Sequence, residues 1–340
     1  MLKILLIKRG AIGDILMTTP LVRQLRHLLP QAIIDYCVAT PFAAVLENNQ
    51  YLNNVISLDE YVFRAKGIIQ YLKFVCKVRK KYDYIFILGK NWRLNLINCL
   101  FTGQTIGYAR EKVSQWLLNK FVTYNDVYRY HGLYYLDLIA ASGLGMPDYT
   151  DIKLDLRINN GDRAIVNQQL LQFGLDKFDV VVNSGGNNQY ESGGLRMLPD
   201  DQIVQLLQVL VNKGRKIILL GGNVDHKNYT EYARINSQMI FNFAGKFNLP
   251  QSAYLISLAH HFYTTDCGAM HLGVIADIGD KMTCFFGPTC PSHVLPPSNK
   301  FDVIWNDHDI FIKDYPLQGK VRHGNVLFFN NLDINKLNIK

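Results

Sequence analysis

The sequence predicts an α/β protein built from two doubly wound parallel sheets, and three observations support this prediction. Short apolar runs alternate with longer amphipathic stretches along both halves of the chain, as expected for buried parallel strands covered by helices. A length of 340 residues suits two domains better than one core. A polar stretch without helical periodicity, residues 150–162, marks a linker. We therefore expect one domain over residues 1–155 and a second over 156–340.

Buried strands are predicted where short apolar runs occur. These runs lie at residues 3–7, 33–39 and 83–88 in the first half, and at 179–183, 216–220, 262–265 and 282–286 in the second. Helices are predicted over residues 16–28, near 41–48, over 67–80 and from Pro199 to Gly214. Ligands of such sheets bind at the carboxyl ends of the strands, so the site is expected in a cleft between the domains. The C-terminal segment is expected to pack back on the first domain.

The excess positive charge is confined to the first half of the chain. The 36 Lys+Arg and 28 Asp+Glu give a net charge of +8. Residues 1–150 contain 18 basic and 10 acidic side chains, whereas the remainder contains 18 of each. No aromatic–basic stacking pattern or nucleic-acid module accompanies the charge, so we expect no nucleic-acid partner. The asymmetry instead predicts an acidic ligand or surface on the first domain.

Composition and spacing exclude several other classes. No apolar run approaches the roughly 18–20 residues that span a bilayer, and the apolar stretch that ends at Lys8 is too short for a signal-peptide core. The six cysteines are scattered without a CxxC pair, which indicates reduced cytosolic thiols. No carboxylate cluster or D-x-D pattern suggests a metal site. We expect a cytoplasmic protein that uses neither a metal nor a cofactor.

The first motif, KRGAIGDILMTTP at residues 8–20, joins a predicted buried strand to a helix. Gly10 and Gly13 permit a tight turn or the close approach of a ligand. Asp14 lies where the helix begins, and the helix dipole stabilises a charged carboxylate there. Asp14 is either a simple N-cap, the commoner role in this position, or a functional carboxylate. The motif is neither a P-loop nor a G-x-G-x-x-G fingerprint, so it indicates neither an ATPase nor an NAD enzyme.

The second motif, TTDCGAMHLG at residues 264–273, ends a predicted strand at Asp266 and begins a helix near Gly268. Backbone N–H groups at such a helix start bind anions. His271, taken alone, is more simply explained as a core-facing helical histidine. Cys267 has no base at the spacing expected for a nucleophile, and we interpret it as a small residue.

Three further turns follow predicted strands in the second half. In the polar loop at residues 184–199, Arg196 either binds a phosphate or is an ordinary solvated charge. The sequence GGNVDH at 221–226 places Asp225 where a carboxylate can accept hydrogen bonds from a ribose diol. The sequence FFGPTCP at 285–291 is a turn signal without chemistry of its own.

These motifs, in this order and spacing, resemble glycosyltransferase family 9, the bacterial ADP-heptose:lipopolysaccharide heptosyltransferases. The similarity extends from Leu2 to about Pro291. It rests on the ordered set GDILMTTP, TIGYAR at 105–110, Ala244-Gly245-Lys246, DCGAMHLG and FGPTCP. The resemblance implies a GT-B fold, in which two Rossmann-like domains face a central cleft. It also implies that the N-terminal domain binds the acceptor and the C-terminal domain binds the nucleotide-sugar.

The resemblance also implies roles for individual residues. Asp14 matches the general base that removes the proton of the acceptor hydroxyl. Arg196 matches a lysine that binds the donor phosphates, and Asp225 matches an acidic residue at the ribose. The other implied donor-binding residues are Ser184, Gly222, Asp266, Cys267, Gly268 and His271. The implied acceptor-binding residues are Lys8, Gly13, Thr18 and Thr19.

The implied reaction is the metal-independent, inverting transfer of heptose from ADP-heptose to a lipid-linked, acidic acceptor of the lipopolysaccharide inner core. Four departures from the family pattern surround the donor pocket. Arg196 replaces a lysine, Leu198 replaces a tryptophan, and Ser184-Gly185-Gly186-Asn187 replaces a P-G-x-S loop. The segment VIADIGDKMTCFFG at 274–287 is about two residues longer than in the family pattern. A different nucleotide-sugar donor is therefore a second hypothesis. A non-catalytic glycolipid-binding relative is a third, which the retention of Asp14 together with Asp266 and His271 disfavours.

The basic excess of the first half has a candidate location at residues 64–81. This stretch contains seven Lys and Arg residues interleaved with Phe74, Val75 and Val78. It is either a solvated helix face or an interfacial stretch that meets anionic lipid or the acidic groups of an acceptor. The lipid-linked substrates of the resembled family favour the second interpretation. The corresponding expectation is a peripheral protein on the cytoplasmic face of the inner membrane.

Overall fold

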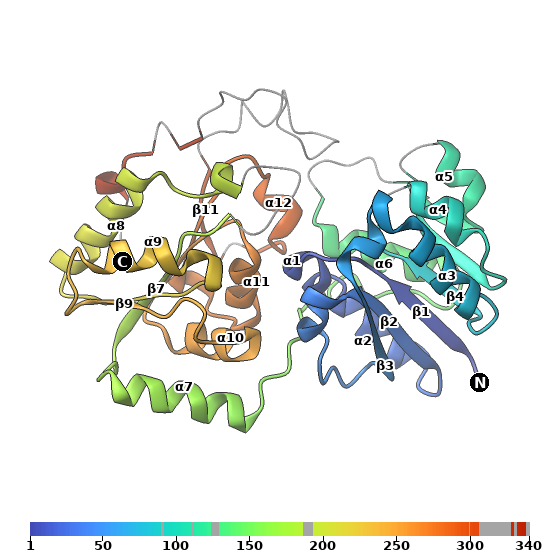
Figure 1. Cartoon of the computed structure of the whole chain (residues 1–340), viewed down its shortest axis with the longest axis horizontal. Helices are drawn as coiled ribbons and strands as arrows, with labels where there is room; N and C mark the ends of the chain where they lie inside the picture. Colours follow the sequence, from blue (N-terminus) through green and yellow to red (C-terminus); the bar gives the residue numbers. More distant parts are fainter. Residues whose placement is uncertain are drawn as a thin grey trace. The chain divides into compact units, whose positions relative to one another are not determined.

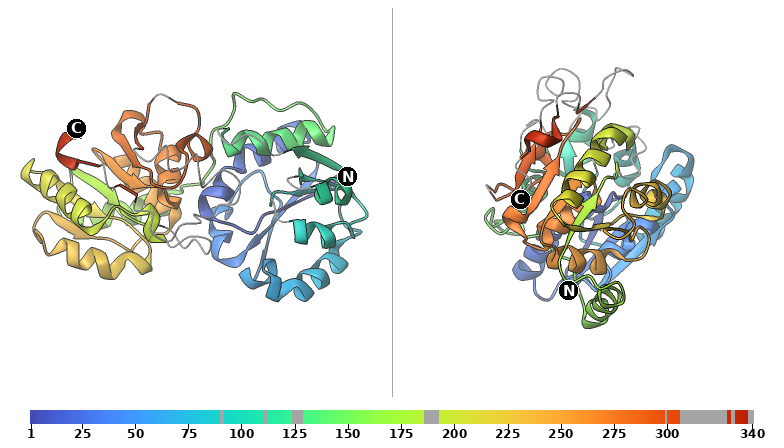
Figure 2. Two further views of the ribbon diagram at one scale, coloured as in Figure 1. Left: turned by 90° about the horizontal axis from the view of Figure 1, so that it is seen from above. Right: turned by 90° about the vertical axis from the view of Figure 1, so that its left-hand side faces the viewer.

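The computed structural model describes residues 1–89, 92–109, 112–123, 129–185, 193–298, 300–305, 328–329 and 332–337. The chain forms two units, Met1–Arg157 and Ile158–Lys340, and this boundary lies two residues beyond the one we predicted. Each unit is a parallel six-stranded sheet flanked by helices (Figures 1 and 2), which confirms the predicted α/β class. Within the described ranges, no helix is both long and apolar enough to cross a membrane.

The first unit has the strand order β3-β2-β1-β4-β5-β6, with every neighbouring pair parallel. Its strands are β1 Lys3–Ile7, β2 Ile33–Ala39, β3 Asn54–Leu58, β4 Tyr84–Ile87, β5 Gln104–Ala109 and β6 Lys120–Thr123. Its helices are α1 Ile12–Leu16, α2 Thr19–Leu28, α3 Ile68–Val78, α4 Trp92–Asn98, α5 Lys112–Leu117 and α6 His131–Ser142, with 3-10 turns at Thr40–Val45, Glu60–Phe63 and Ala65–Gly67. Because β1 lies inside the sheet, the apolar run from Ile4 to Ile7 is buried on both faces.

Helices α3 and α4 cover one face of the first sheet. Tyr71, Val75 and Val78 of α3 and Ile97 of α4 form a buried cluster with residues of β1, β2 and β4. Figure 1 shows α5 next to α4 in the same part of this unit. The helical spacing of these apolar residues explains why α3 was predictable from the sequence.

The predicted helix over residues 16–28 is interrupted before Thr19, so that the short α1 is followed by a separate α2. Pro20 has no N–H to donate to the carbonyl of Leu16. The Thr19 hydroxyl donates to that carbonyl instead, at 2.7 Å. The Thr18 hydroxyl donates in the same way to the carbonyl of Ile15, at 2.7 Å. The interruption therefore follows from the Thr-Thr-Pro sequence.

The last segment of the first unit is anchored to α2. The Arg23 guanidinium donates to Asp151 at 2.7 and 3.1 Å and also bonds to Asp155. The Gln24 side chain donates to the backbone carbonyl of Asp148 at 2.8 Å, and the Asp148 N–H donates back to it at 2.9 Å. Arg23 is 7% exposed, so its charge is compensated by this carboxylate pair in a largely buried place.

The second unit has the strand order β12-β11-β10-β7-β8-β9, again with every pair parallel. Its strands are β7 Phe178–Val182, β8 Lys216–Leu219, β9 Ile240–Asn242, β10 Phe262–Thr265, β11 Met282–Phe285 and β12 Asp302–Ile304. Its helices are α7 Asn160–Gln172, α8 Asp200–Asn212, α9 His226–Ala233, α10 Leu249–Leu258, α11 Gly268–Ile275 and α12 Pro291–Val294, with 3-10 turns at Gly193–Arg196, Asn223–Asp225, Gly279–Lys281 and Ile334–Lys336.

The predicted linker is shorter than expected because its last residues begin α7. The Asn159 side chain accepts from the N–H of Asp162 at 2.9 Å, and the Asp162 carboxylate accepts from the N–H of Asn159 at 3.1 Å. This reciprocal pair is a capping box. The polar Asn-Asn-Gly-Asp sequence, which we interpreted as a loop, is therefore a helix start.

The described residues of the C-terminal segment, 328–329 and 332–337, pack on the second unit. The expected packing of this segment on the first domain stays a prediction. Phe328, Phe329, Leu332 and Ile334 belong to the buried cluster formed by β7, β8, α8 and α9. The apolar residues of this segment complete the core of its own unit.

Candidate active site

In the first unit, the candidate base Asp14 lies in the first turn of α1, directly after the turn that follows β1. The N-cap of α1 is Ala11, and no side chain caps this helix. Asp14 is therefore not an N-cap, which was its simpler interpretation. Gly10 is required in the turn, because a Cβ there would lie 2.2 Å from the ring of Phe42. The Asp14 side chain is 39% exposed, so one side of the carboxylate is open to solvent.

A buried lysine lies beside this carboxylate. Lys8, at the end of β1, is only 7% exposed. Its Nζ lies 3.4 Å from Asp14 Oδ2 and donates to the hydroxyl of Tyr135 at 2.8 Å and to the carbonyl of Leu88 at 3.4 Å. An ammonium group at this distance stabilises the negative charge of a carboxylate. Lys8 was expected to bind the acceptor, and the structure places it where it holds Asp14.

The other predicted acceptor residues are buried. Thr18 and Thr19 are 0% exposed, and Gly13 is buried inside α1. The Thr18 hydroxyl is 3.0 Å from the hydroxyl of Tyr36, and burial raises the pKa values of both Tyr36 and Tyr135. These tyrosines are therefore neutral at physiological pH. The acceptor roles of the two threonines stay predictions, and their observed bonds fix the path between α1 and α2.

In the second unit, predicted donor residues from three strand ends are connected by hydrogen bonds. The Ser184 N–H donates to the hydroxyl of Thr265 at 3.1 Å, and that hydroxyl donates to the Ser184 carbonyl at 2.7 Å. The Asp225 carboxylate accepts from the N–H of Gly222 at 2.8 Å. Burial raises the pKa of Asp225, and hydrogen bonds from Gly222 and Ser184 oppose this shift. Ser184 therefore joins the ends of β7, β8 and β10.

Arg196 and Asp266 form an ion pair in the same part of the second unit. The Arg196 Nη1 lies 2.9 Å from Asp266 Oδ2, and the two side chains are 17% and 4% exposed. Asn183 fixes the segment that bears Arg196. Its side chain accepts from the Leu198 N–H at 2.8 Å and donates to the Leu198 carbonyl at 3.1 Å. The arginine is thus held at the carboxyl end of β7, next to the end of β10.

Cys267 and Gly268 begin α11, directly after Asp266. Cys267 is the N-cap in an extended conformation, and no side chain caps the helix. Burial raises the pKa of the Cys267 thiol, so the thiol is protonated at neutral pH and is a poor nucleophile. His271 lies on α11 and is 4% exposed, which fits the core-histidine interpretation. Its donor contact stays a prediction.

Three residues that hold the candidate site residues in place were not predicted from the sequence. Tyr135 bonds to Lys8, Thr265 bonds to Ser184, and Asn183 bonds to Leu198. Asn183 gave one signal, since it is a polar residue at the end of a predicted buried strand. The predicted polar loop includes residues 186–192, and the TIGYAR motif ends at Arg110; these positions lie outside the described residues.

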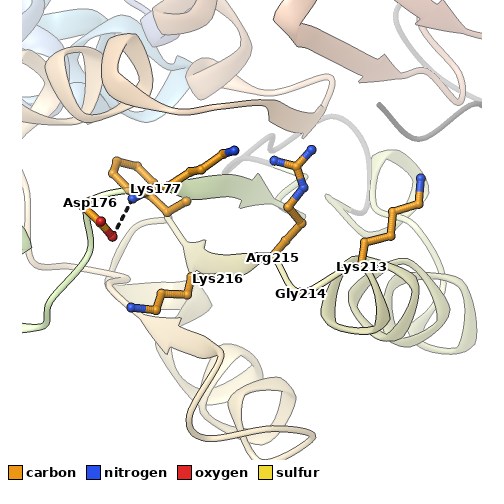
Figure 3. A pocket seen from close by; sticks show the side chains of 7 residues that line it. Asp176, Lys177, Lys213, Gly214, Arg215 and Lys216 are labelled. Atoms are coloured by element: carbon orange, nitrogen blue, oxygen red, sulfur yellow. Dashed lines mark hydrogen bonds between the residues drawn. The ribbon is translucent and has the colours of Figure 1, made fainter.

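A separate pocket of about 560 Å³ lies at the amino ends of β7 and β8. It is lined by Asp176, Lys177, Phe178 and residues 213–216. Figure 3 shows Lys177, Lys213, Arg215 and Lys216 around it. Because β7 and β8 are parallel, this pocket is at the edge of the sheet opposite Ser184 and Gly222, and it is not part of the donor-residue cluster. Among the residues that the structure describes, no group of three His, Cys, Asp or Glu side chains is placed to hold a metal ion.

The sequence and the fold of this chain are similar to those of known proteins. Residues 71–313 match the family model of glycosyltransferase family 9 (heptosyltransferase). Lipooligosaccharide heptosyltransferase 2 of Haemophilus ducreyi is 24% identical over 312 residues, which are 89% of this chain and 88% of that protein. The solved structure of ADP-heptose lipopolysaccharide heptosyltransferase II of E. coli has a TM-score of 0.71 and 23% identity, covering 89% of this chain and 90% of that one. A family 9 glycosyltransferase from Veillonella parvula has a TM-score of 0.74 and 20% identity, covering 89% and 85%.

Proposed function

The chain belongs to glycosyltransferase family 9, and from this premise we propose that it is an inverting, metal-independent heptosyltransferase. The proposed reaction moves heptose from ADP-heptose to an acceptor in the lipopolysaccharide inner core. The observation on which the proposal depends is the half-exposed Asp14 carboxylate held by the buried Lys8. The match to a lipooligosaccharide heptosyltransferase over most of both chains supports the acceptor class.

In the proposed mechanism, Asp14 is the general base. Inversion requires a base on the face of the anomeric carbon opposite the leaving group, where it takes the proton of the attacking hydroxyl. The Asp14 carboxylate is 39% exposed, and its Oδ2 is 3.4 Å from Lys8 Nζ. Lys8 fixes the orientation of the carboxylate and stabilises its ionised form, which is the form that accepts a proton. The bond from Lys8 to Tyr135 in turn fixes the lysine.

The donor is proposed to bind at the connected strand ends of the second unit. Its diphosphate would accept hydrogen bonds from Arg196 and from the backbone N–H groups at the start of α11, which stabilise the charge that develops on the leaving group. Asp225 would accept hydrogen bonds from the ribose hydroxyls. The ion pair with Asp266 orients Arg196 before the donor arrives. In this arrangement the protein's own groups, Arg196 and the N–H groups of α11, stabilise the leaving group.

A donor screen tests the proposed reaction. A donor at 100 times its Kd stabilises the folded protein by about 2.7 kcal/mol. We expect ADP-heptose to raise Tm and ADP alone to give a smaller shift, measured by differential scanning fluorimetry. Transfer to a deacylated inner-core oligosaccharide, followed by mass spectrometry, identifies the product. Stabilisation by another nucleotide-sugar, with no response to ADP-heptose, would contradict the proposed donor. That alternative is motivated by the arginine at position 196, where the resemblance leads us to expect a lysine.

Replacing Lys8 tests its positioning role. We expect Lys8→Met to lower kcat about tenfold and to move the acid limb of the pH–rate profile to higher pH. The reason is that the carboxylate loses the cation that stabilises its ionised form. The exposed Lys3 on the same strand provides a matched control in Lys3→Met. An unchanged acid limb in Lys8→Met, with lower stability as the only effect, would assign Lys8 a purely structural role.

We further propose that the enzyme acts at the cytoplasmic face of the inner membrane, as a peripheral protein. The basic excess of the first half supports this location, because the proposed acceptor is lipid-linked and acidic. The exposed basic residues Lys73, Lys77 and Lys80 of α3 and the following turn are placed to contribute.

A further inference from the structure

Three neighbouring helices of the first unit expose large apolar side chains on their outer sides. These side chains are Ile69 and Leu72 of α3, Leu96 of α4, Leu100 directly after it, and Val113 and Trp116 of α5. Trp116 is 89% exposed and Ile69 is 63% exposed. We refer to these six residues, together with the exposed lysines Lys73, Lys77 and Lys80, as the α3–α5 face. Exposed tryptophan is unusual on a soluble surface and marks an interaction site when other apolar residues surround it.

The helices that form this face are fixed to one another. The Tyr71 hydroxyl of α3 donates to Asn98 of α4 at 2.7 Å. The Asn95 amide of α4 donates to the Ser114 hydroxyl of α5 at 3.4 Å. Figure 1 shows the three helices side by side. The inward side chains Tyr71, Val75 and Val78 of α3 and Ile97 of α4 belong to the core of the first sheet. In α5, Ser114 is buried. The outward apolar residues are therefore exposed in the folded unit.

The charge of this region is mainly positive. Residues 60–117, which include the three helices, contain eleven Lys and Arg residues and three acidic ones, Glu60, Asp83 and Glu111. Glu60 pairs with Arg64 at 2.7 Å. Asp83 accepts from the N–H of Lys3 at 2.8 Å. On α3, Ile69, Leu72 and Lys73 are followed by Lys77 and Lys80 at helical spacing, so apolar and basic side chains share one exposed side. The exposed lysines Lys73, Lys77 and Lys80 therefore give the α3–α5 face a positive charge.

We propose that the α3–α5 face docks on an anionic lipid bilayer, with Trp116 at the boundary between headgroups and acyl chains. This inference rests on the proposed function, which requires access to a lipid-linked acceptor. Tryptophan prefers the membrane interface because its ring is apolar and its N–H is polar. Lysines at the same depth attract anionic headgroups and extend their charges toward water. Apolar insertion and charge together give reversible binding, whereas either alone is weak.

Charge also distinguishes this occupant from a second copy of the chain. Two copies that met through the α3–α5 face would bring two sets of lysines together, and like charges across an interface oppose association. A bilayer that contains phosphatidylglycerol presents the opposite sign over the whole face. The lipid surface is therefore the occupant that matches both the apolar and the charged residues.

Vesicle binding tests the proposal. We expect the wild-type protein to bind vesicles that contain phosphatidylglycerol much more tightly than vesicles of pure phosphatidylcholine, measured by flotation at low salt. Trp116→Ala should lower the partition coefficient roughly tenfold. The triple variant Lys73→Gln/Lys77→Gln/Lys80→Gln should lower it by about 100-fold. The control Lys177→Gln/Lys213→Gln/Lys216→Gln removes three charges from the pocket of the second unit (Figure 3) and should bind as the wild type does.

Fluorescence shows whether Trp116 enters the bilayer. Anionic vesicles should shift the tryptophan emission to shorter wavelength, and brominated lipids should quench it, with both effects lost in Trp116→Phe. Equal vesicle binding by the wild type and both α3–α5 variants would overturn the proposal. So would dimerisation that is lost in Trp116→Ala without vesicles, since it would identify a second copy as the occupant. Transfer to a lipid-free acceptor, unchanged in these variants, distinguishes this outcome from a failure of the proposed reaction.

Discussion

Replacing Asp14 with asparagine should lower kcat by roughly 100- to 10,000-fold, the range that a general base contributes. Asparagine has nearly the shape of aspartate but does not accept a proton at neutral pH. The change leaves α1 intact, because Ala11 and not Asp14 occupies the N-cap. Donor binding should be nearly unchanged, since the proposed donor-binding residues lie in the other unit. Initial rates of transfer and isothermal titration with ADP-heptose measure the two quantities separately.

Asp59→Asn is the matched control for this experiment. Asp59 is an exposed carboxylate of the first unit, so its replacement removes the same charge without touching the Lys8–Asp14 pair. We expect wild-type kinetics for this variant. If Asp14→Asn transferred heptose at the wild-type rate, the base would have to be another group.

Arg196→Gln should weaken donor binding and lower kcat/KM by roughly 100-fold. A charge-assisted hydrogen bond to a phosphate is about twice as strong as a neutral one, and removing a donor to the developing negative charge costs about 100- to 1,000-fold. The second effect is on stability. Asp266 is 4% exposed in its side chain, and losing its partner leaves a buried charge that costs about 3 kcal/mol.

Two further variants separate these effects. Arg196→Gln/Asp266→Asn should regain most of the lost Tm but not the lost activity, because the buried charge is gone while the phosphate contact is still missing. Arg196→Lys should recover part of the donor affinity. Arg234→Gln is the matched control, since Arg234 is an exposed residue of the second unit that pairs with Glu231. Equal kcat/KM in the wild type and Arg196→Gln would remove Arg196 from the donor site.

The sequence predicted most of the interior strands, although it missed β5, and it predicted none of the edge strands. The buried runs 3–7, 33–39 and 262–265 coincide with β1, β2 and β10, because interior parallel strands are apolar on both faces. β3 and β6 were not predicted. They lie at the two edges of the first sheet, and half or more of their residues are exposed or partly exposed, so their apolar signal is interrupted.

The candidate site was predictable where a single motif contains it, and unpredictable where distant segments meet. Asp266 follows a predicted strand directly, and Asp14 and Asp225 lie in the turns or helix starts that come after predicted strands. The contact of Lys8 with Tyr135 spans 127 positions in the sequence, and no local pattern reports such a contact. From the sequence alone we therefore assigned Lys8 to the acceptor. In the folded protein Lys8 is buried, and it contacts Tyr135 of helix α6.

The anchoring of residues 148–155 on α2 and the capping box of α7 have a joint consequence for the backbone. Asp155 is held by Arg23, and Asn159 is held by Asp162. Only residues 156–158 lie between these two fixed points. Any rotation of one unit against the other must therefore be accommodated at the connection by the torsion angles of about three residues. Proline at one of these positions would remove part of that freedom without altering a single site residue.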